Sequence, residues 1–251
     1  MSKPPGDGTR RRKLTIAVGG GLAVLVIAFL LVYFVIFPTS SPKPFKLSNP
    51  TTTTSAASTG TTSTPTPTSA TGLSGTWNIA SGSQAGYRVR EKLAFLPAQS
   101  DAVGRTSSVT GGATFTESGA TVTITAAKFS IAVNTLKSDR SMRDEKIRSI
   151  GLESERFPTA TFALSSPLKL PVSAITGKVA HASVTGVVEI HGTSRRETLP
   201  VELSLSGSTL QAAGSLTFPW SEFGMTAPSV GGFVNVTEHA TMEFDLRLQR
   251  A

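Results

Sequence analysis

The side chains that could do acid–base chemistry are densest in residues 138–150, which read SDRSMRDEKIRSI. Asp139, Asp144 and Glu145 are the candidates there, because general acid–base catalysis needs carboxyl or imidazole groups held beside the reacting atoms. The chain contains neither a Gly-x-Ser-x-Gly nucleophile elbow nor a phosphate-binding glycine loop. We therefore predict no catalytic residue.

The three histidines, His181, His191 and His239, are the remaining candidates for proton transfer or metal binding. None has a partner at a metal-binding spacing such as His-x-x-x-His. The chain has no cysteine, which excludes disulfides, a thiol nucleophile and a thiolate metal site. We predict no metal site and no cofactor.

The formal net charge of +8 is unevenly distributed. Residues 1–71 hold seven basic residues and one acidic residue, so seventeen basic and fifteen acidic residues remain for 72–251. A nucleic-acid-binding domain is expected to carry the basic excess on its own surface. The sequence therefore argues against a nucleic-acid partner.

Residues 14–37 form an uncharged, largely apolar run that directly follows Arg10-Arg11-Arg12-Lys13. As a helix, these 24 residues would extend roughly 36 Å, which exceeds the hydrocarbon thickness of about 30 Å. A cleaved signal peptide is the alternative, but its apolar region is shorter and ends at a small-residue site. We predict a single transmembrane helix, with residues 1–13 in the cytoplasm and the rest of the chain extracytoplasmic.

Residues 38–71 are predicted to be a disordered linker. Fifteen of the twenty-one residues from Thr51 to Thr71 are Ser or Thr. Such a composition buries too little apolar surface to offset the entropy of ordering. The linker could carry O-linked sugars or act as a bare spacer.

From residue 72 to residue 251 the apolar residues follow a period of two, which is typical of strands with one buried face. The clearest examples are Val122 and Ile124; Val201, Leu203 and Leu205; and Met242, Phe244, Leu246 and Leu248. Glycine-containing segments are expected to turn the chain, at Gly111-Gly112, Glu117-Ser118-Gly119, Ser206-Gly207-Ser208 and Gly231-Gly232. Residues 138–150 interrupt the pattern as a short helical excursion that ends at Gly151.

We expect an all-β domain with about eight antiparallel strands. A sheet of this size folds into a sandwich or closes into a barrel, and periodicity alone does not choose between them. An eight-stranded barrel is just wide enough to be filled by side chains or to hold one small ligand.

A series of motifs in residues 75–250 resembles the YceI-like family of lipid-binding, lipocalin-like barrels. The matching segments are Gly75-Thr76-Trp77-Asn78-Ile79, Gly86-Tyr87-Arg88-Val89, Ser130-Ile131 with Asn134-Thr135, Arg143-Asp144, Ile147-Arg148-Ser149, Phe157-Pro158 with Thr161-Phe162, Val184–Gly192, Thr198–Val201 and Glu222-Phe223-Gly224-Met225. The sequence departs from the family pattern at Ile150–Glu153, where a Phe-Phe or Phe-Leu pair is usual, and at Trp220-Ser221, where Arg-Ser is common.

The resemblance implies an extended eight-stranded antiparallel barrel whose apolar interior holds an isoprenoid chain outside the cytoplasm. The predicted ligand-binding residues are the large apolar side chains expected on the inward faces of the strands. They are Phe115, Ile124, Phe129, Phe162, Leu203, Phe218, Phe223, Met242 and Phe244. A solid core built from the same residues is the alternative.

Arg143 is the candidate contact for a ligand headgroup, because a guanidinium can bind a phosphate through charge-assisted hydrogen bonds. Alternatively, Arg143 and Asp144 hold the helical excursion against the barrel.

The sequence therefore predicts a membrane-tethered extracytoplasmic protein that binds an isoprenoid or another long-chain lipid. The alternative is a cell-envelope interaction or stress-related module with a filled barrel and no ligand. An enzyme acting on a lipid is the third hypothesis, and it lacks a recognisable catalytic constellation.

Overall fold

The computed structural model describes residues 41–47, 72–93, 99–230 and 234–251. The chain divides into two compact units, Met1–Ser41 and Pro42–Ala251, and the second contains nearly all of the described residues. None of the helices in the described part of the chain combines the length and apolar character that a membrane crossing requires. The predicted transmembrane segment 14–37 and most of the predicted linker lie outside the described residues.

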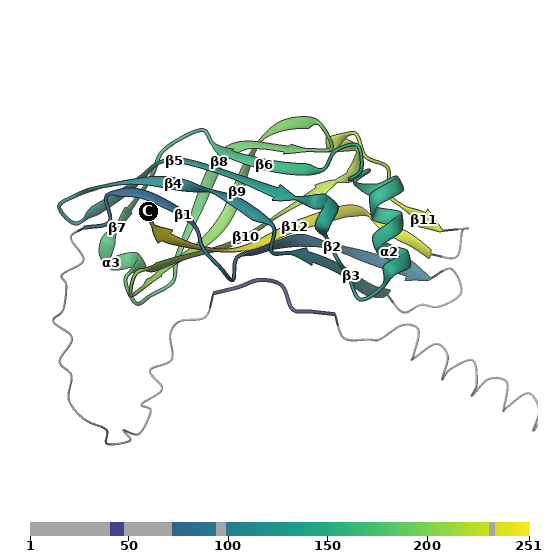
Figure 1. Ribbon diagram of the computed structural model, residues 1–251, viewed down its shortest axis with the longest axis horizontal. Helices are drawn as coiled ribbons and strands as arrows, with labels where there is room; N and C mark the ends of the chain where they lie inside the picture. The colour runs from purple at the N-terminus through teal and green to yellow at the C-terminus, as the bar shows by residue number, and fades with distance from the viewer. Residues whose placement is uncertain (1–40, 48–71, 94–98, 231–233) are drawn as a thin grey trace, which may run out of the picture. The chain divides into compact units, whose positions relative to one another are not determined.

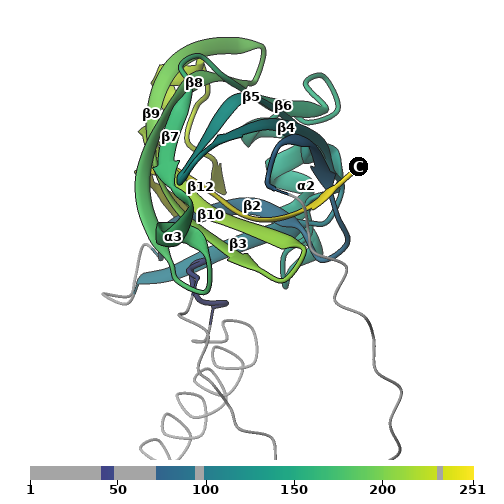
Figure 2. The ribbon, with the colours of Figure 1, turned by 90° about the vertical axis from the view of Figure 1, so that its left-hand side faces the viewer.

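Eight antiparallel strands close into a barrel, which confirms the predicted barrel and excludes the sandwich (Figures 1 and 2). In spatial order the strands are β1 (Gly75–Ile79), β4 (Val109–Ser118), β5 (Thr121–Ala132), β6 (Thr159–Leu164), β8 (Ala180–Ile190), β9 (Thr193–Ser206), β10 (Thr209–Pro219) and β12 (Val234–Arg250). The ring closes where Trp77–Ile79 of β1 pairs with Leu248–Arg250 of β12. Figure 2 looks along the barrel and shows the strands arranged around a central space.

Additional strands extend the barrel at its two ends. The first part of β12 pairs with β2 (Gln84–Leu93), and β2 pairs with β3 (Gln99–Thr106). Arg105 and Lys137 exchange backbone hydrogen bonds of 2.9 and 3.0 Å, which attach β3 to the chain after β5. The short strand β7 (Leu168–Pro171) pairs with β5, and β11 (Ser229–Val230) pairs with β12.

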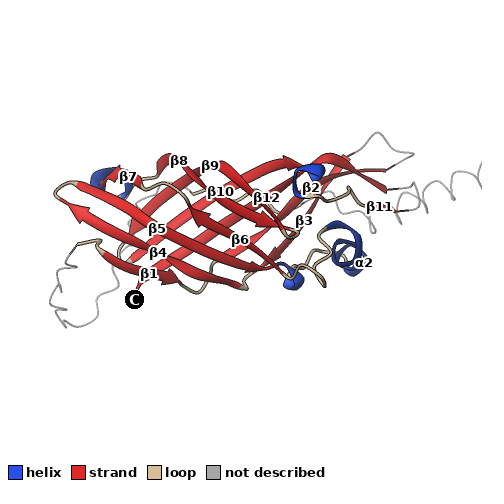
Figure 3. Ribbon diagram, turned by 90° about the horizontal axis from the view of Figure 1, so that it is seen from above, coloured by secondary structure: helices blue, strands red, loops and turns tan. Residues whose placement is uncertain are grey.

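The predicted helical excursion is confirmed as two consecutive short turns, α2 (Ser141–Lys146) and the π-helical η2 (Ile147–Gly151). The Asp144 carboxylate accepts hydrogen bonds from the backbone N–H of Ser138 at 2.8 Å and from its hydroxyl at 2.7 Å. Ile147 is buried against the barrel. The excursion therefore packs against the barrel through Ile147, and Figure 3 shows α2 at one end of the barrel.

Two short helical turns complete the described chain. The helix α3 (Val172–Ile175) lies at the opposite end of the barrel from α2 (Figure 1). The 3-10 turn η3 (Trp220–Phe223) follows β10. Gly224 ends this turn with a φ of +67°, a left-handed conformation in which a side chain would be strained.

The turn positions are only partly as expected. Gly119 and Gly207 lie in tight turns between consecutive strands, as the sequence indicated. Gly111 and Gly112 instead lie inside β4, so the prediction of a turn there was wrong. A Cβ atom on Gly111 would lie 2.1 Å from the carbonyl oxygen of Lys128. These glycines thus serve close strand packing.

A buried carboxylate on the outer surface joins three strands. Glu243 of β12 points away from the barrel interior, yet it is only 2 % exposed. Its carboxylate binds Arg88 of β2 at 3.3 Å and Arg105 of β3 at 2.8 Å. Because a buried charge is tolerated only when it is paired, this cluster stabilises the extended end of the barrel.

Residues 42–47 form an extended strap against the same cluster. Arg88 donates to the backbone carbonyl of Pro42 at 2.6 Å, and Arg105 donates to the carbonyl of the following residue at 2.6 Å. The Arg105 guanidinium also lies 3.8 Å from the ring centroid of Phe45, in a cation–π contact. The strap is therefore part of the folded unit, a feature that sequence reasoning did not predict.

Candidate functional site: an apolar cavity in the barrel

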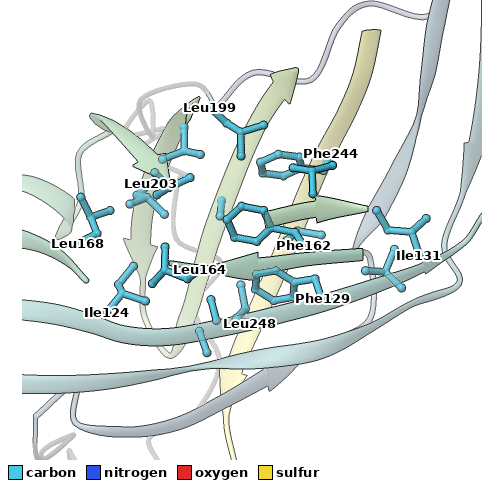
Figure 4. A pocket seen from close by; sticks show the side chains of 18 of the residues that line it. Ile124, Phe129, Ile131, Phe162, Leu164, Leu168, Leu199, Leu203, Phe244 and Leu248 are labelled. Atoms are coloured by element: carbon cyan, nitrogen blue, oxygen red, sulfur yellow. The ribbon is translucent and has the colours of Figure 1, made fainter. Parts of the chain in front are cut away.

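The barrel is hollow. Its interior contains a cavity of about 130 Å³, and the unfilled space is about 1060 Å³ when side-chain crevices and adjoining solvent are included. Large apolar side chains from β5, β6, β9 and β12 converge on this space (Figure 4). Thr161 is the single polar residue among the described residues that line the cavity.

The alternation along the strands explains this wall. On β12, Met242, Phe244, Leu246 and Leu248 all line the cavity, whereas Glu243 points outward. Successive strand residues point to opposite faces of the sheet, so one period-two run supplies a continuous apolar strip. The cavity is therefore the product of several such strips brought together by ring closure.

Glycines let two large rings lie flat against the wall. Phe244 pairs directly with Gly214 of β10, and a Cβ atom on Gly214 would lie 2.7 Å from the ring. A Cβ atom on Gly186 of β8 would lie 2.3 Å from the ring of Phe162. Each ring therefore occupies the space that a neighbouring side chain would otherwise fill, which leaves the barrel axis open.

Seven of the nine residues predicted to line the interior do line the cavity. They are Phe115, Ile124, Phe129, Phe162, Leu203, Met242 and Phe244. Phe218 and Phe223 do not line it. Phe218 lines a smaller compartment. Phe223 is fully buried and packs edge-on against the ring of Phe218, with ring centroids 4.8 Å apart. Ligand contact by any of these residues stays a prediction.

Sequence reasoning did not single out the aliphatic majority of the wall. The residues missed include Val109, Ile131, Leu164, Leu168, Val184, Val188, Leu199, Val201, Leu210, Leu216, Leu246 and Leu248. The signal was present in the alternation of Leu199, Val201 and Leu203 on β9. The prediction from the sequence selected mainly aromatic side chains and therefore left out these aliphatic residues, which contribute equally to an apolar surface.

A second, smaller compartment of about 20 Å³ lies toward α2 and shares Ile131 and Met242 with the cavity. Tyr87 of β2 lines it, and its hydroxyl is buried without a hydrogen-bond partner among the described residues. Burial raises the pKa of Tyr87, more than the nearby Arg143 charge lowers it. The hydroxyl therefore stays protonated, and Ser138 is the polar side chain that interacts with it.

Arg143 lies beside this compartment but is held by carboxylates. Its guanidinium binds Glu91 in a bidentate pair at 2.9 and 3.0 Å, and it also binds Asp139. Burial alone would lower the pKa of Arg143, but the hydrogen bonds and charge of Glu91 raise it overall. This geometry supports the structural role for Arg143, because the pair fixes α2 to β2.

The other titratable side chains do not assemble around the cavity. His191 binds Glu153 at 2.6 Å and lies 4.3 Å from the ring of Phe157. His181 lies 3.8 Å from Glu202, and its side chain is largely exposed. None of these groups lines the cavity, and the described residues contain no cluster of three or more potential metal ligands.

Structure comparison finds similar barrels at low sequence identity. A polyisoprenoid binding domain from Saccharophagus degradans matches with a TM-score of 0.52 and 14 % identity, over 70 % of this chain and 98 % of that domain. Burkholderia cenocepacia BcnA matches with a TM-score of 0.46 and 18 % identity, over 65 % of this chain and 95 % of that protein. The Campylobacter jejuni YCEI protein matches with a TM-score of 0.46 and 13 % identity, over 59 % of this chain and 84 % of that protein. At these identities the likeness concerns the fold alone.

A search of curated proteins found no match. A family model for the YceI-like domain matches residues 77–248, which comprise most of the chain and all eight strands of the ring except the ends of β1 and β12. The match spans the same residues that build the apolar cavity. The chain therefore belongs to the family of proteins with a YceI-like domain.

Proposed function

We propose that the barrel binds the apolar chain of an isoprenoid or a similar long-chain lipid. The apolar wall of the interior cavity is the observation that carries this proposal. Burial of apolar surface contributes about 25 cal/mol per Å², and a wall in which Thr161 is the one polar residue among those described offers little to hold water instead. The polyisoprenoid binding domain of Saccharophagus degradans has a similar fold and supports the ligand class.

The cavity volume indicates how much of such a chain the barrel holds without moving its side chains. An apolar cavity of about 150 Å³ in another protein stays dry and binds benzene. The permanent cavity of about 130 Å³ thus holds a segment of similar size. A longer chain extends along the side-chain crevices, and it displaces lining side chains as it does so. We expect affinity to rise with chain length until this space is filled.

We further propose that the protein is anchored in a membrane through residues 14–37, with the barrel extracytoplasmic. The strap shortens the connection that the sequence suggested, because Pro42 is already fixed to the barrel. Five residue steps from Phe37 to Pro42 reach at most roughly 18 Å. The barrel would then lie close to the bilayer from which it takes its lipid.

Native mass spectrometry of the purified full chain, followed by organic extraction, tests lipid binding. We expect about one isoprenoid per protein, bound before purification or after incubation with a polyprenol. A protein that stays empty after incubation would refute the proposal and favour a cell-envelope interaction module.

The topology needs a separate test. The chain has no cysteine, so a Ser208→Cys variant places one thiol in the exposed turn between β9 and β10. Labelling of intact cells with an impermeant maleimide is expected. Labelling only after lysis would place the barrel in the cytoplasm.

A further inference from the structure

A groove on the outside of the barrel lies directly over the cavity wall. It is formed by residues 110–114 of β4 and 126–130 of β5, with Thr76 and Asn78 of β1 and Leu164 of β6. We call it the outer groove, and its volume is about 530 Å³. β4, β5 and β6 run across the face of the barrel seen in Figure 3.

The outer groove and the cavity share four lining residues, Ala113, Ala127, Phe129 and Leu164. These four residues therefore contact both spaces, and two of them are alanines. Burial follows the same division, because Ala126 is exposed on the outer face whereas Ala113 is buried. Small side chains thus form part of the wall between the outer groove and the cavity.

The hydrogen-bonded ladder is also interrupted at this place. β7 pairs with Thr121–Ile124 of β5, and β6 pairs with Lys128–Ala132. Within the described pairings, Thr125–Ala127 has a partner in neither strand. After β6 the chain turns toward β8, where the Ser165 N–H donates to the Thr185 carbonyl. A stretch of three residues without a partner on this side of β5 is about 10 Å long.

The two ends of the barrel are closed by packed side chains. At the α2 end, Ile147 and Phe223 are buried in one hydrophobic cluster. At the other end, Ile175 of α3 is buried in a second cluster with Leu248. A lipid chain passing through either end would have to displace a packed cluster, whereas the gap beside β5 presents small residues and a broken ladder.

We propose that the gap between β5 and the β6–β7 segment is a lateral portal, through which the apolar lipid chain enters and leaves the cavity. This proposal rests on the proposed lipid-binding function. Leu164 and Phe129 are the side chains that must move, because they line both spaces. Lys128 is the one charged residue among those that line the outer groove, and no carboxylate lies there. A lipid head left at the portal is therefore neutral or anionic.

A bulky residue in the outer groove tests the portal without filling the cavity. Ala126→Phe adds a ring on the outer face, and Thr116→Phe adds the same ring on exposed β4 surface outside the groove. The full chain, held in phosphatidylcholine nanodiscs, is mixed with dansyl-labelled farnesol. Direct excitation of the dansyl group then reports uptake and release.

For Ala126→Phe, we expect both rates to fall at least tenfold while the dissociation constant stays within twofold of the parent value. Thr116→Phe should leave both rates unchanged. Parental rates in Ala126→Phe would overturn the portal. No equilibrium binding of the probe by the parent protein would instead refute the proposed function.

A reversible crosslink tests whether β5 and β6 must separate. Lys128 and Ala163 are directly paired, and paired residues in an antiparallel ladder lie about 4.5–5.5 Å apart at Cα, within disulfide range. The oxidised Lys128→Cys/Ala163→Cys variant should exchange the probe slowly, and reduction should restore the rate. The matched control is Thr185→Cys/Thr198→Cys, whose native hydroxyl oxygens are 2.9 Å apart on β8 and β9. Equal rates in both redox forms of the Lys128/Ala163 variant would contradict the portal.

Discussion

Partial filling of the cavity should make the lipid-free protein more stable and its lipid binding weaker. Ala212 of β10 lines the cavity between its partners Leu203 and Leu246. Ala212→Leu adds three carbon atoms, which would contribute up to about 2.4 kcal/mol at about 0.8 kcal/mol per buried methylene. Imperfect fit reduces this, so we expect about 1–2 kcal/mol. The melting temperature should rise by about 2–4 °C per kcal/mol for a domain of this size.

The same carbon atoms take space from the ligand. If the lipid loses the equivalent apolar contacts, about 1–2 kcal/mol of binding free energy disappears, which corresponds to roughly a 5- to 30-fold weaker affinity. Thermal unfolding of delipidated protein measures the first effect. Equilibrium titration with dansyl-labelled farnesol measures the second.

Ala102→Leu is the matched control, because Ala102 of β3 is fully buried in the core and does not line the cavity. Overpacking at such a site costs about 1–3 kcal/mol, so this variant should melt at a lower temperature with unchanged affinity. If Ala212→Leu also lowered the melting temperature, the cavity would lack the space that we describe. If it raised stability without weakening lipid binding, the cavity would not be the binding site.

Three further substitutions test the outer cluster and the wall. Glu243→Gln removes the buried charge that pairs with two partly buried arginines and should cost about 3–5 kcal/mol, against about 1 kcal/mol or less for Asp101→Asn, as measured by urea unfolding. Gly214→Ala should push the Phe244 ring into the cavity and weaken probe binding in the same titration. Burial raises the pKa of Asp245, so native stability falls as the pH rises through that pKa. Asp245→Asn should therefore be more stable than the parent protein at pH 7. The difference in stability should vanish in acid, below the unfolded-state pKa of about 3.9.

The period-two pattern predicted side-chain direction well wherever a strand is regular. On β12, the residues expected on the apolar face, from Met242 to Leu248, do line the cavity. The pleat makes this inference reliable, because a side chain cannot change face without a bulge or a shift of register. The same pattern could not decide between barrel and sandwich, since closure depends on β1 meeting β12 at opposite ends of the domain.

Two of the residues predicted to line the interior lie outside the main cavity, for different reasons. Phe223 lies in η3, where a 3-10 turn replaces the strand period, and its ring packs into the end of the barrel. Phe218 lies near the end of β10 and faces the smaller compartment. Residues 42–47 were missed for a related reason, because their contacts are with arginines about 46 to 62 residues away and no local pattern encodes them.

The open cavity has an energetic cost that a ligand recovers when it fills the space. Core cavities destabilise proteins by about 24 cal/mol per Å³, so 130 Å³ corresponds to about 3 kcal/mol. Eight-stranded barrels can be filled by their own side chains. This chain instead places alanines at positions such as Ala113, Ala127 and Ala212, and it lays Phe244 flat over Gly214. A ligand that fills the cavity recovers the 3 kcal/mol, about a hundredfold in affinity, before any further contact is counted. Under the proposed function, the small residues of the wall thus convert folding stability into affinity for an apolar chain.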